Sequence, residues 1–187
     1  MIDILPLTRE TLDGAMAVLD AQFGPNSPDP VDPDEFDSYR TWLPVSLSDR
    51  PDGKKVGEKG PKEEHDIDYL KYWVAFDPEQ RKVVGVTGVF TKGKEPDRAY
   101  LGWMGVQVDY QGSHSRDIEN SLMTFTMAVA RSLGKRYLFS YFSDAPEDDG
   151  VRRFQFAHGF RYFDQEQRGE SGEKVLFYRY DLRLEVD

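Results

Sequence analysis

The spacing of hydrophobic residues changes period several times along the chain, and each change predicts a helix or a strand. Residues 2–5, with Ile2, Ile4 and Leu5, predict a short first strand that ends at Pro6. Thr8 is a suitable N-cap, and large hydrophobic residues then recur with helical spacing at Leu12, Met16, Leu19 and Phe23. Gly24 and Pro25 come next, so the predicted helix ends there.

In the middle of the chain the pattern becomes that of strands. Residues 72–76 and 83–90 are rich in aromatic and β-branched side chains, and a polar turn at 77–82 separates them, which predicts a β-hairpin. Residues 99–108 predict a third strand. The first half of the chain is therefore expected to be mainly antiparallel.

A long helix is predicted next, over 116–133. Its apolar stripe consists of Ile118, Leu122, Phe125, Val129 and Leu133. Asp117 and Glu119 are expected in its first turn and Arg131 near its end, which suits the dipole of the helix. Gly134 follows as a suitable C-cap.

The remaining elements complete a sheet. Residues 137–142 predict a strand, and because one helix joins it to 99–108, the two strands are expected to run parallel. A helix at 148–158 and a hairpin of 160–163 with 175–182 follow. These elements predict an α/β (α+β) fold with a mixed, mostly antiparallel central sheet flanked by helices.

The length of 187 residues suits a single domain over 1–187, with an insertion at about 26–68. The insertion is rich in Pro, Gly and Asp, and its 12 acidic and 6 basic side chains supply −6 of the net charge of −10. Within it, one short amphipathic helix is predicted by Phe36, Tyr39, Trp42 and Leu43. A segment of this kind is either a functional loop or a solvated insertion, and the pattern leaves both open.

Composition narrows the classes of function. The acidic balance, 34 Asp and Glu against 24 Lys and Arg, argues against nucleic acid or an anionic membrane as a partner. The chain has no cysteine and its three histidines lie far apart, so no metal site is expected. The first residues do not resemble a signal peptide and no apolar run is long enough to span a membrane, so a cytoplasmic protein is expected.

The segment before the long helix is suited to binding an anion. A strand runs into a polar loop at 109–115, and the loop leads to a helix N-terminus, where unpaired backbone N–H groups attract negative charge. A pyrophosphate fits that arrangement. The alternative is that Ser113 or Ser115 merely caps the helix.

Three segments in this order resemble the GNAT (Gcn5-related N-acetyltransferase) superfamily. They are the strand and loop 106–112, the start of the next strand at 135–139, and the helix and turn 148–160. The first is similar to the family's V-x-P-x-x-R/Q-G-x-G-x-G/A loop, and the last to its N-x-x-A-x-x-F-Y-x-x-x-G-F helix. The resemblance covers most of the chain outside 26–68.

This resemblance implies transfer of an acyl group, usually acetyl, from coenzyme A to an amine, with acetyl-CoA as co-substrate and no metal. The residues that would line the pantetheine arm are Met104, Gly105, Val106 and Val108. Those that would hold the diphosphate are Gln111, Gly112, Ser113, His114, Ser115 and Arg116.

Two departures from the family pattern bear on the chemistry. His114 and Arg116 stand where the family has glycines, so they either obstruct the phosphate site or supply charge to it. Gln155 stands where many members carry the tyrosine thought to protonate the leaving thiolate, and glutamine is no acid at neutral pH.

Catalysis needs a group that accepts the amine's proton and a donor to the thioester oxygen. A backbone N–H on the 99–106 strand can be that donor, but the strand carries no acidic side chain. The candidates elsewhere are Tyr141 as an acid, and Asp144 and Glu147 as bases.

Two hypotheses of function follow. The first is an N-acyltransferase acting on a small-molecule or peptide amine. Its acceptor would be a cation approached along the acidic segment 26–68, where Tyr39 and Trp42 could pack on an ammonium group. The second is a non-catalytic GNAT-like module that binds a partner protein or ligand. The sequence also leaves a homodimer open.

Overall fold

The computed structural model describes residues 2–24, 33–47, 67–107, 110, 113–143, 149–168 and 173–183. The strands within these residues are β1 (Asp3–Pro6), β2 (Ile67–Asp77), β3 (Lys82–Lys92), β4 (Arg98–Leu101), β5 (Gly105–Val106), β6 (Tyr137–Ser143), β7 (Arg161–Arg168) and β8 (Glu173–Asp181). The helices are α1 (Arg9–Phe23), α2 (Pro33–Ser46), α3 (Ser113–Ser132) and α4 (Asp149–Ala157).

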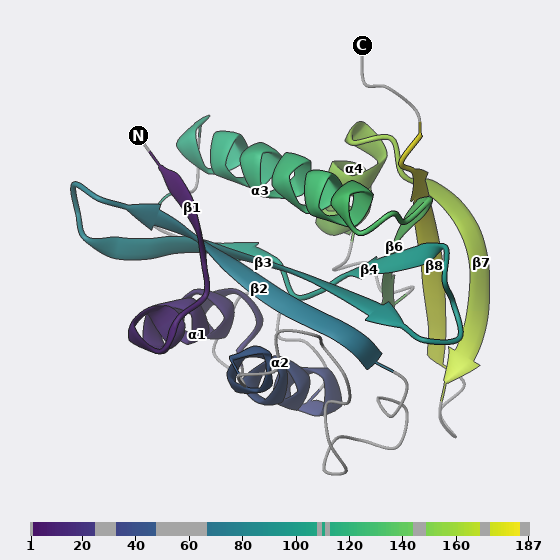
Figure 1. The fold of residues 1–187 in the computed structure, drawn as a ribbon, viewed down its shortest axis with the longest axis horizontal. Helices are drawn as coiled ribbons and strands as arrows, with labels where there is room; N and C mark the ends of the chain where they lie inside the picture. Colours follow the sequence, from purple (N-terminus) through teal and green to yellow (C-terminus); the bar gives the residue numbers. More distant parts are fainter. Residues whose placement is uncertain are drawn as a thin grey trace.

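One mixed sheet forms the middle layer of the molecule (Figure 1). Its strand order is β1-β2-β3-β4-β6-β8-β7, and β5 pairs with β3 beside that path. All pairs are antiparallel except β4 with β6. Helices α1 and α2 cover one face, and α3 and α4 cover the other (Figure 1). The predicted fold class is confirmed.

The N-terminal elements agree with the hydrophobic pattern. Thr8 is the N-cap of α1, and it forms a capping box with Thr11, each side chain accepting from the other residue's backbone N–H. Gly24 closes the helix through its N–H, which donates to the Asp20 carbonyl at 2.9 Å. The predicted hairpin is also present as β2 and β3, each 11 residues long.

The predicted strand 99–108 is wrong as a continuous element. It is broken into β4 and β5, and residues 102–104 between them are not in a strand. Tyr72 of β2 lies over Gly88 of β3, where an added Cβ would be 2.4 Å from its ring. From there its Oη accepts a hydrogen bond from the Trp103 backbone N–H at 3.2 Å. A side chain therefore bonds the backbone at the break, which residue spacing alone does not reveal.

The parallel arrangement of the second half is confirmed. β4 pairs with β6 in parallel from Arg98↔Tyr137 to Tyr100↔Phe139, and α3 crosses between them. α3 begins at Ser113, earlier than expected, so Asp117 and Glu119 lie beyond its first turn.

The buried face of α3 differs in part from the predicted stripe. Ile118 and Leu122 are buried as expected, but the expected later members are only partly buried. The residues buried instead are Met123, Thr126, Met127 and Ala130. Thr126 shares a 2.7 Å hydrogen bond with Thr87 of β3, so a polar residue belongs to the core face. A stripe drawn through large hydrophobic residues misses it.

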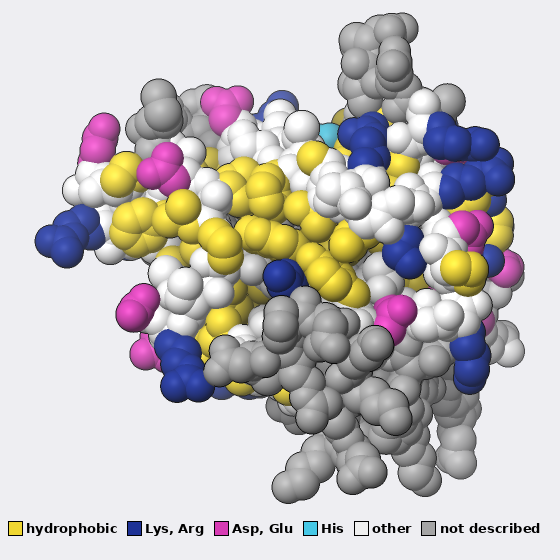
Figure 2. All heavy atoms as spheres, in the orientation of Figure 1, with side chains coloured by type: hydrophobic (Ala, Val, Ile, Leu, Met, Phe, Trp, Pro, Cys, Tyr) yellow, Lys and Arg dark blue, Asp and Glu magenta, His cyan; other side chains and the backbone are white. Residues whose placement is uncertain are grey.

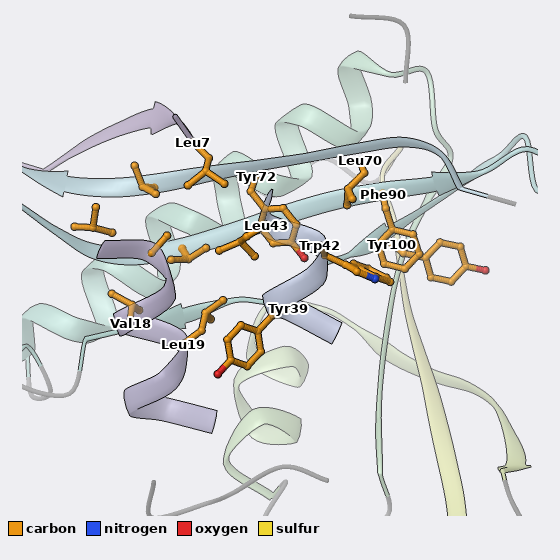
Figure 3. Close-up of a cluster of buried hydrophobic side chains, with 14 of the residues drawn as sticks. Leu7, Val18, Leu19, Tyr39, Trp42, Leu43, Leu70, Tyr72, Phe90 and Tyr100 are labelled. Carbon is orange, nitrogen blue, oxygen red and sulfur yellow. The ribbon is translucent and has the colours of Figure 1, made fainter. Parts of the chain in front are cut away.

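The helix predicted within 26–68 is α2, and its inner face is part of the core. Tyr39, Trp42 and Leu43 are buried, and Figure 3 shows Trp42 beside Phe90, Leu43 near Tyr72, and Tyr39 near Leu19 of α1. The ring of Trp42 meets Phe90 of β3 edge-on at 4.9 Å. This part of the segment therefore covers the sheet and is no solvated loop.

The last elements also agree with the expected order. α4 ends in a turn at Gly159, whose φ of +85° favours glycine, and β7 pairs with β8 in an antiparallel hairpin.

On the face in Figure 2, hydrophobic side chains form a band across the middle of the molecule, and Lys and Arg side chains gather at the edge near β7 and β8. None of the described helices is long and apolar enough to cross a membrane.

Candidate active site

The two parallel strands are paired at one end only. β6 continues past Phe139, but from Ser140 to Ser143 its strand partner is β8 alone. β5 lies further along the chain than β4, and among the described strands it pairs only with β3. Within the part of the chain that the structure describes, no strand pairs with the second edge of β5. None pairs with the second edge of β6 from Ser140 to Ser143 either. An unpaired strand edge offers backbone N–H and C=O groups to a ligand.

The backbone direction of β5 follows from its pairing. The N–H of Gln107 donates to Val84 of β3 at 2.9 Å. Since N–H groups alternate in direction along a strand, the N–H of Val106 points away from β3, toward the unpaired side. It donates to Oε1 of Gln22, at the end of α1, at 3.0 Å. The edge is thus occupied by a side chain in this structure.

The residues expected to line a pantetheine arm meet this edge. Gly105 and Val106 are buried in β5, and Met104 is partly buried beside them. Met104 and Val106 pack with residues of α3. Gly105 lies under α1, where an added Cβ would be 2.4 Å from Gln22 Oε1. The fourth residue, Val108, lies outside the described residues.

The residues expected to hold the diphosphate belong to the start of α3 and the loop before it. Ser113 is the first residue of α3, and His114 follows it; their side chains are not described. Ser115 is buried and Arg116 is exposed. Gln111 and Gly112 lie outside the described residues.

Tyr110 ties the loop before α3 to the sheet. Its hydroxyl donates to Asp77, at the end of β2, at 2.5 Å, and its backbone N–H donates to the Gln107 carbonyl at 3.0 Å. Asp77 also accepts the backbone N–H groups of Glu79 and Gln80. Burial and the bond to Asp77 raise the pKa of Tyr110 to about 12, and the same bond holds the pKa of Asp77 below its usual value. At neutral pH the pair is therefore a protonated phenol on a carboxylate.

The three catalytic candidates are only partly described. Tyr141 lies on β6 in the part that pairs with β8 alone, is partly buried, and faces the α1 and α2 side of the sheet, 5.9 Å from the ring of Phe177. Asp144 and Glu147 lie outside the described residues. Tyr141 therefore lies on the part of β6 that is not paired with β4, and the catalytic roles of all three residues stay predictions.

Gln155 lies on the opposite side of β6. It is buried on α4, and its Nε2 donates to Oγ of Ser140 at 2.5 Å. Its Oε1 is buried and has no hydrogen-bond partner among the described residues. The position that departs from the family pattern thus links α4 to the residue of β6 where pairing with β4 has ended.

Three aromatic residues, Phe23 of α1, Tyr39 of α2 and Trp103 between β4 and β5, form a cluster that is called the aromatic wall below. It lies on the side of the sheet that α1 and α2 cover. Trp103 lies 5.3 Å from the ring of Phe23 and 5.4 Å from that of Tyr39. Tyr39 donates its hydroxyl to Asp20, and Arg40 forms a 2.7 Å ion pair with the same carboxylate. Burial and the bond to Asp20 raise the pKa of Tyr39. This wall joins the C-terminal end of α1 to α2 and to the break.

The expected packing of Tyr39 and Trp42 on an ammonium group is wrong for this structure. Tyr39 is fully buried and Trp42 is 8% exposed, and both rings contact other core rings. The reason is that α2 directs its aromatic residues at the sheet, which hides them from a ligand in solution. Sequence reasoning also missed Gln22 and Trp103, which carry no local pattern that marks them.

Comparisons with known proteins place this geometry in a known fold. No family model matches the chain, and no curated protein matches it. Solved structures do match. A candidate acetyltransferase of the GNAT family from Desulfovibrio desulfuricans has a TM-score of 0.72 at 16% identity, with 97% of this chain and 99% of that chain covered. Aminoglycoside 6'-acetyltransferase type Ii has a TM-score of 0.65 at 14% identity, with 96% and 97% covered.

The ribosomal-protein-S18-alanine N-acetyltransferase from Escherichia coli also matches, with a TM-score of 0.62 at 12% identity over 100% of this chain and 97% of that chain. At these identities the similarity shows the fold. The chain therefore has the fold of the GNAT acetyltransferases, as the resemblance of its motifs implied.

Proposed function

We propose that this protein is an N-acyltransferase that transfers an acetyl or other acyl group from coenzyme A to an amine. The observation that carries the proposal is that β4 pairs with β6 whereas β5, the next strand on the same edge of β3, does not, with the N-terminus of α3 next along the chain. A pantetheine arm contains amide groups that pair with a strand edge, and a helix N-terminus suits a diphosphate.

The described residues fit such a co-substrate. The Val106 N–H points to the unpaired side and donates to a side-chain carboxamide oxygen, which is the kind of acceptor that a pantetheine amide offers. Arg116 is exposed in the first turns of α3 and available to a phosphate. When bound, the co-substrate would supply the acyl group as a thioester.

The chain's own groups would then handle orientation and protons. A backbone N–H at the β4–β5 break would donate to the thioester oxygen as negative charge develops there. The amine must lose a proton before it attacks the carbonyl carbon, and Asp144 or Glu147 would accept it. Tyr141 would protonate the sulfur when the carbon–sulfur bond breaks.

One observation favours a second candidate, a non-catalytic module of the same fold. Gln155 is buried, bonded to Ser140, and lacks an acidic proton, so the position that commonly supplies the acid in the family supplies none here. On this reading the strand edge or the acidic segment binds a partner without chemistry.

Two measurements separate the two candidates: calorimetry with acetyl-CoA tests binding, and mass spectrometry tests transfer. The acyltransferase proposal requires binding, and a ligand at 100 times its Kd should raise the unfolding free energy by about 2.7 kcal/mol. Acyl transfer would then be followed by mass spectrometry with a polyamine and a lysine-rich peptide as acceptors. Absence of binding at millimolar acetyl-CoA would reject the proposal, and binding without transfer to any amine would favour the second candidate.

For the acceptor we infer a cationic amine approached along 26–68. The segment carries −6 of the net charge, and an acidic surface speeds the encounter with cations in a salt-dependent way. Two proteins of similar fold are named as an aminoglycoside 6'-acetyltransferase and as a ribosomal-protein-S18-alanine N-acetyltransferase, which supports an amine acceptor without choosing between small molecule and peptide.

The test is to neutralise Asp32, Asp34, Glu35 and Asp37 together. We expect KM for a polyamine or basic peptide to rise and its salt dependence to flatten, since the long-range attraction is lost. Neutralising four exposed residues outside this segment, Asp3, Glu10, Asp13 and Glu79, is the control for net charge. Unchanged kinetics in the first variant for every accepted amine would leave 26–68 without a role in acceptor binding.

A further inference from the structure

The unpaired edge of β5 is occupied by a side chain that resembles the ligand expected there. Oε1 of Gln22 accepts the Val106 N–H at 3.0 Å, across 84 positions of sequence. The accepting group is a carboxamide oxygen, which is chemically the same acceptor as the carbonyl of a peptide or of a pantetheine amide. The structure therefore shows that this N–H binds a carboxamide and that the protein provides one itself.

The surroundings are shaped for this contact. Gly105 leaves the space through which Gln22 reaches the edge, because a Cβ there would lie 2.4 Å from Oε1 and 3.2 Å from Leu19 Cδ2. A side chain at position 105 would therefore clash with Gln22 and prevent it from reaching the Val106 N–H.

The glutamine can leave without moving its helix. Asp20, two residues earlier, holds the end of α1 to α2 through Tyr39 and Arg40. Gln22 itself is only partly buried and has flexible side-chain torsions, so its amide can swing to water at the cost of one hydrogen bond.

We propose that Gln22 is an internal competitor for the site: its carboxamide occupies the Val106 N–H in the free protein, and an amide of the pantetheine arm displaces it. This rests on the proposed function. Gln22 then sets the affinity for coenzyme A, because binding must first release it, and the apparent Kd rises as the fraction of open sites falls.

The proposal predicts opposite effects for two substitutions. Gln22→Met keeps the size of the side chain and removes the amide acceptor, so coenzyme A should bind about two- to tenfold more tightly. Gln22→Glu places a carboxylate, a stronger acceptor, on the same N–H, so coenzyme A should bind more weakly by a similar factor. Gln165→Met and Gln165→Glu on the exposed side of β7 are the matched controls and should leave Kd unchanged.

Calorimetry with coenzyme A gives the Kd values, and hydrogen exchange of the Val106 amide, followed by NMR, reports the contact directly. We expect faster exchange in free Gln22→Met than in the unaltered protein, and slow exchange in both after coenzyme A is added. Equal affinity in all variants, or weaker binding by Gln22→Met, overturns the competitor role while the proposed function stands. If neither the unaltered protein nor either variant binds coenzyme A, with Val106 exchange unchanged on its addition, both proposals fail.

Discussion

The run 98–106 contains two short strands that are held very differently. β4 has β3 on one side and β6 on the other, and its Tyr100 stacks on Phe90 at 5.0 Å and lies 5.7 Å from Phe139. Of the described strands, only β3 pairs with β5, and Gln22 bonds the other edge. We call β4 the closed half of this run and β5 the open half. The closed half is part of the core, whereas the open half has a backbone N–H group that either a side chain or a ligand can bind.

The comparison shows how two short strands in one run of residues can have different roles, β4 in stability and β5 in binding. Where β4 is paired with β3 and β6, its backbone groups bond within the sheet and aromatic packing adds to the stability. β5 lacks the pairing that β4 makes with β6. The backbone N–H groups of Val106 and Trp103 donate instead to the side chains of Gln22 and Tyr72, so they remain hydrogen-bonded. A site of this kind costs little stability in the free protein.

The largest effect is expected in the closed half. Phe139 is 2% exposed and contacts rings from β4 and β7, so Phe139→Ala should lower the unfolding free energy by about 3–5 kcal/mol. Urea denaturation measures this. Leu5→Ala, at a 42% exposed position, should change it by less than about 0.5 kcal/mol. Similar losses at the two positions would mean that the closed half is not core.

The next effect concerns binding at the open half. Arg116 is exposed at the start of α3, so Arg116→Ala should weaken acetyl-CoA binding by about 1.5–3 kcal/mol with no change in stability. Calorimetry measures the affinity, and Arg9→Ala at the exposed start of α1 is the control. Full affinity in Arg116→Ala would show that backbone donors alone hold the diphosphate.

The break between the halves can be tested through Gly88. A methyl group at this position would lie 2.4 Å from the Tyr72 ring, so Gly88→Ala should push the ring away from Trp103 and cost about 1–3 kcal/mol. Gly150→Ala is the control, because nothing lies within 4 Å of the added methyl group and alanine favours the helix. A neutral result at Gly88 would mean that the Tyr72 contact does not hold the break.

The smallest effect is a pH dependence at the loop that enters α3. The bond from Tyr110 holds the pKa of Asp77 below its ordinary value of 3.8, so this contribution to stability is present above that pH and is lost as pH falls through the lower folded pKa. Tyr110→Phe should therefore be less stable than the unaltered protein at pH 7 and at pH 5, with the gap closing below about pH 4. Denaturation across this range measures it, and a gap that stays constant to the lowest pH would exclude Asp77 as its source.

Local patterns predicted much of the fold correctly. The cap at Thr8, the hairpin, the parallel pairing of residues 98–100 with 137–139 and the final hairpin all follow from spacing within a few residues and from the handedness of a strand–helix–strand crossover. Each of these depends on neighbours in sequence or on a general rule of chain geometry.

Only the tertiary structure decided how the candidate site is arranged. The bond between Gln22 and Val106 spans 84 positions, and the one between Tyr72 and the Trp103 backbone spans 31. The burial of Tyr39, which sequence reasoning had assigned to a ligand, depends on how α2 rests on the sheet. Hydrophobic spacing reports which face of an element is buried, but it carries no information on which distant side chain meets an unpaired backbone group, because that is set by how whole elements pack.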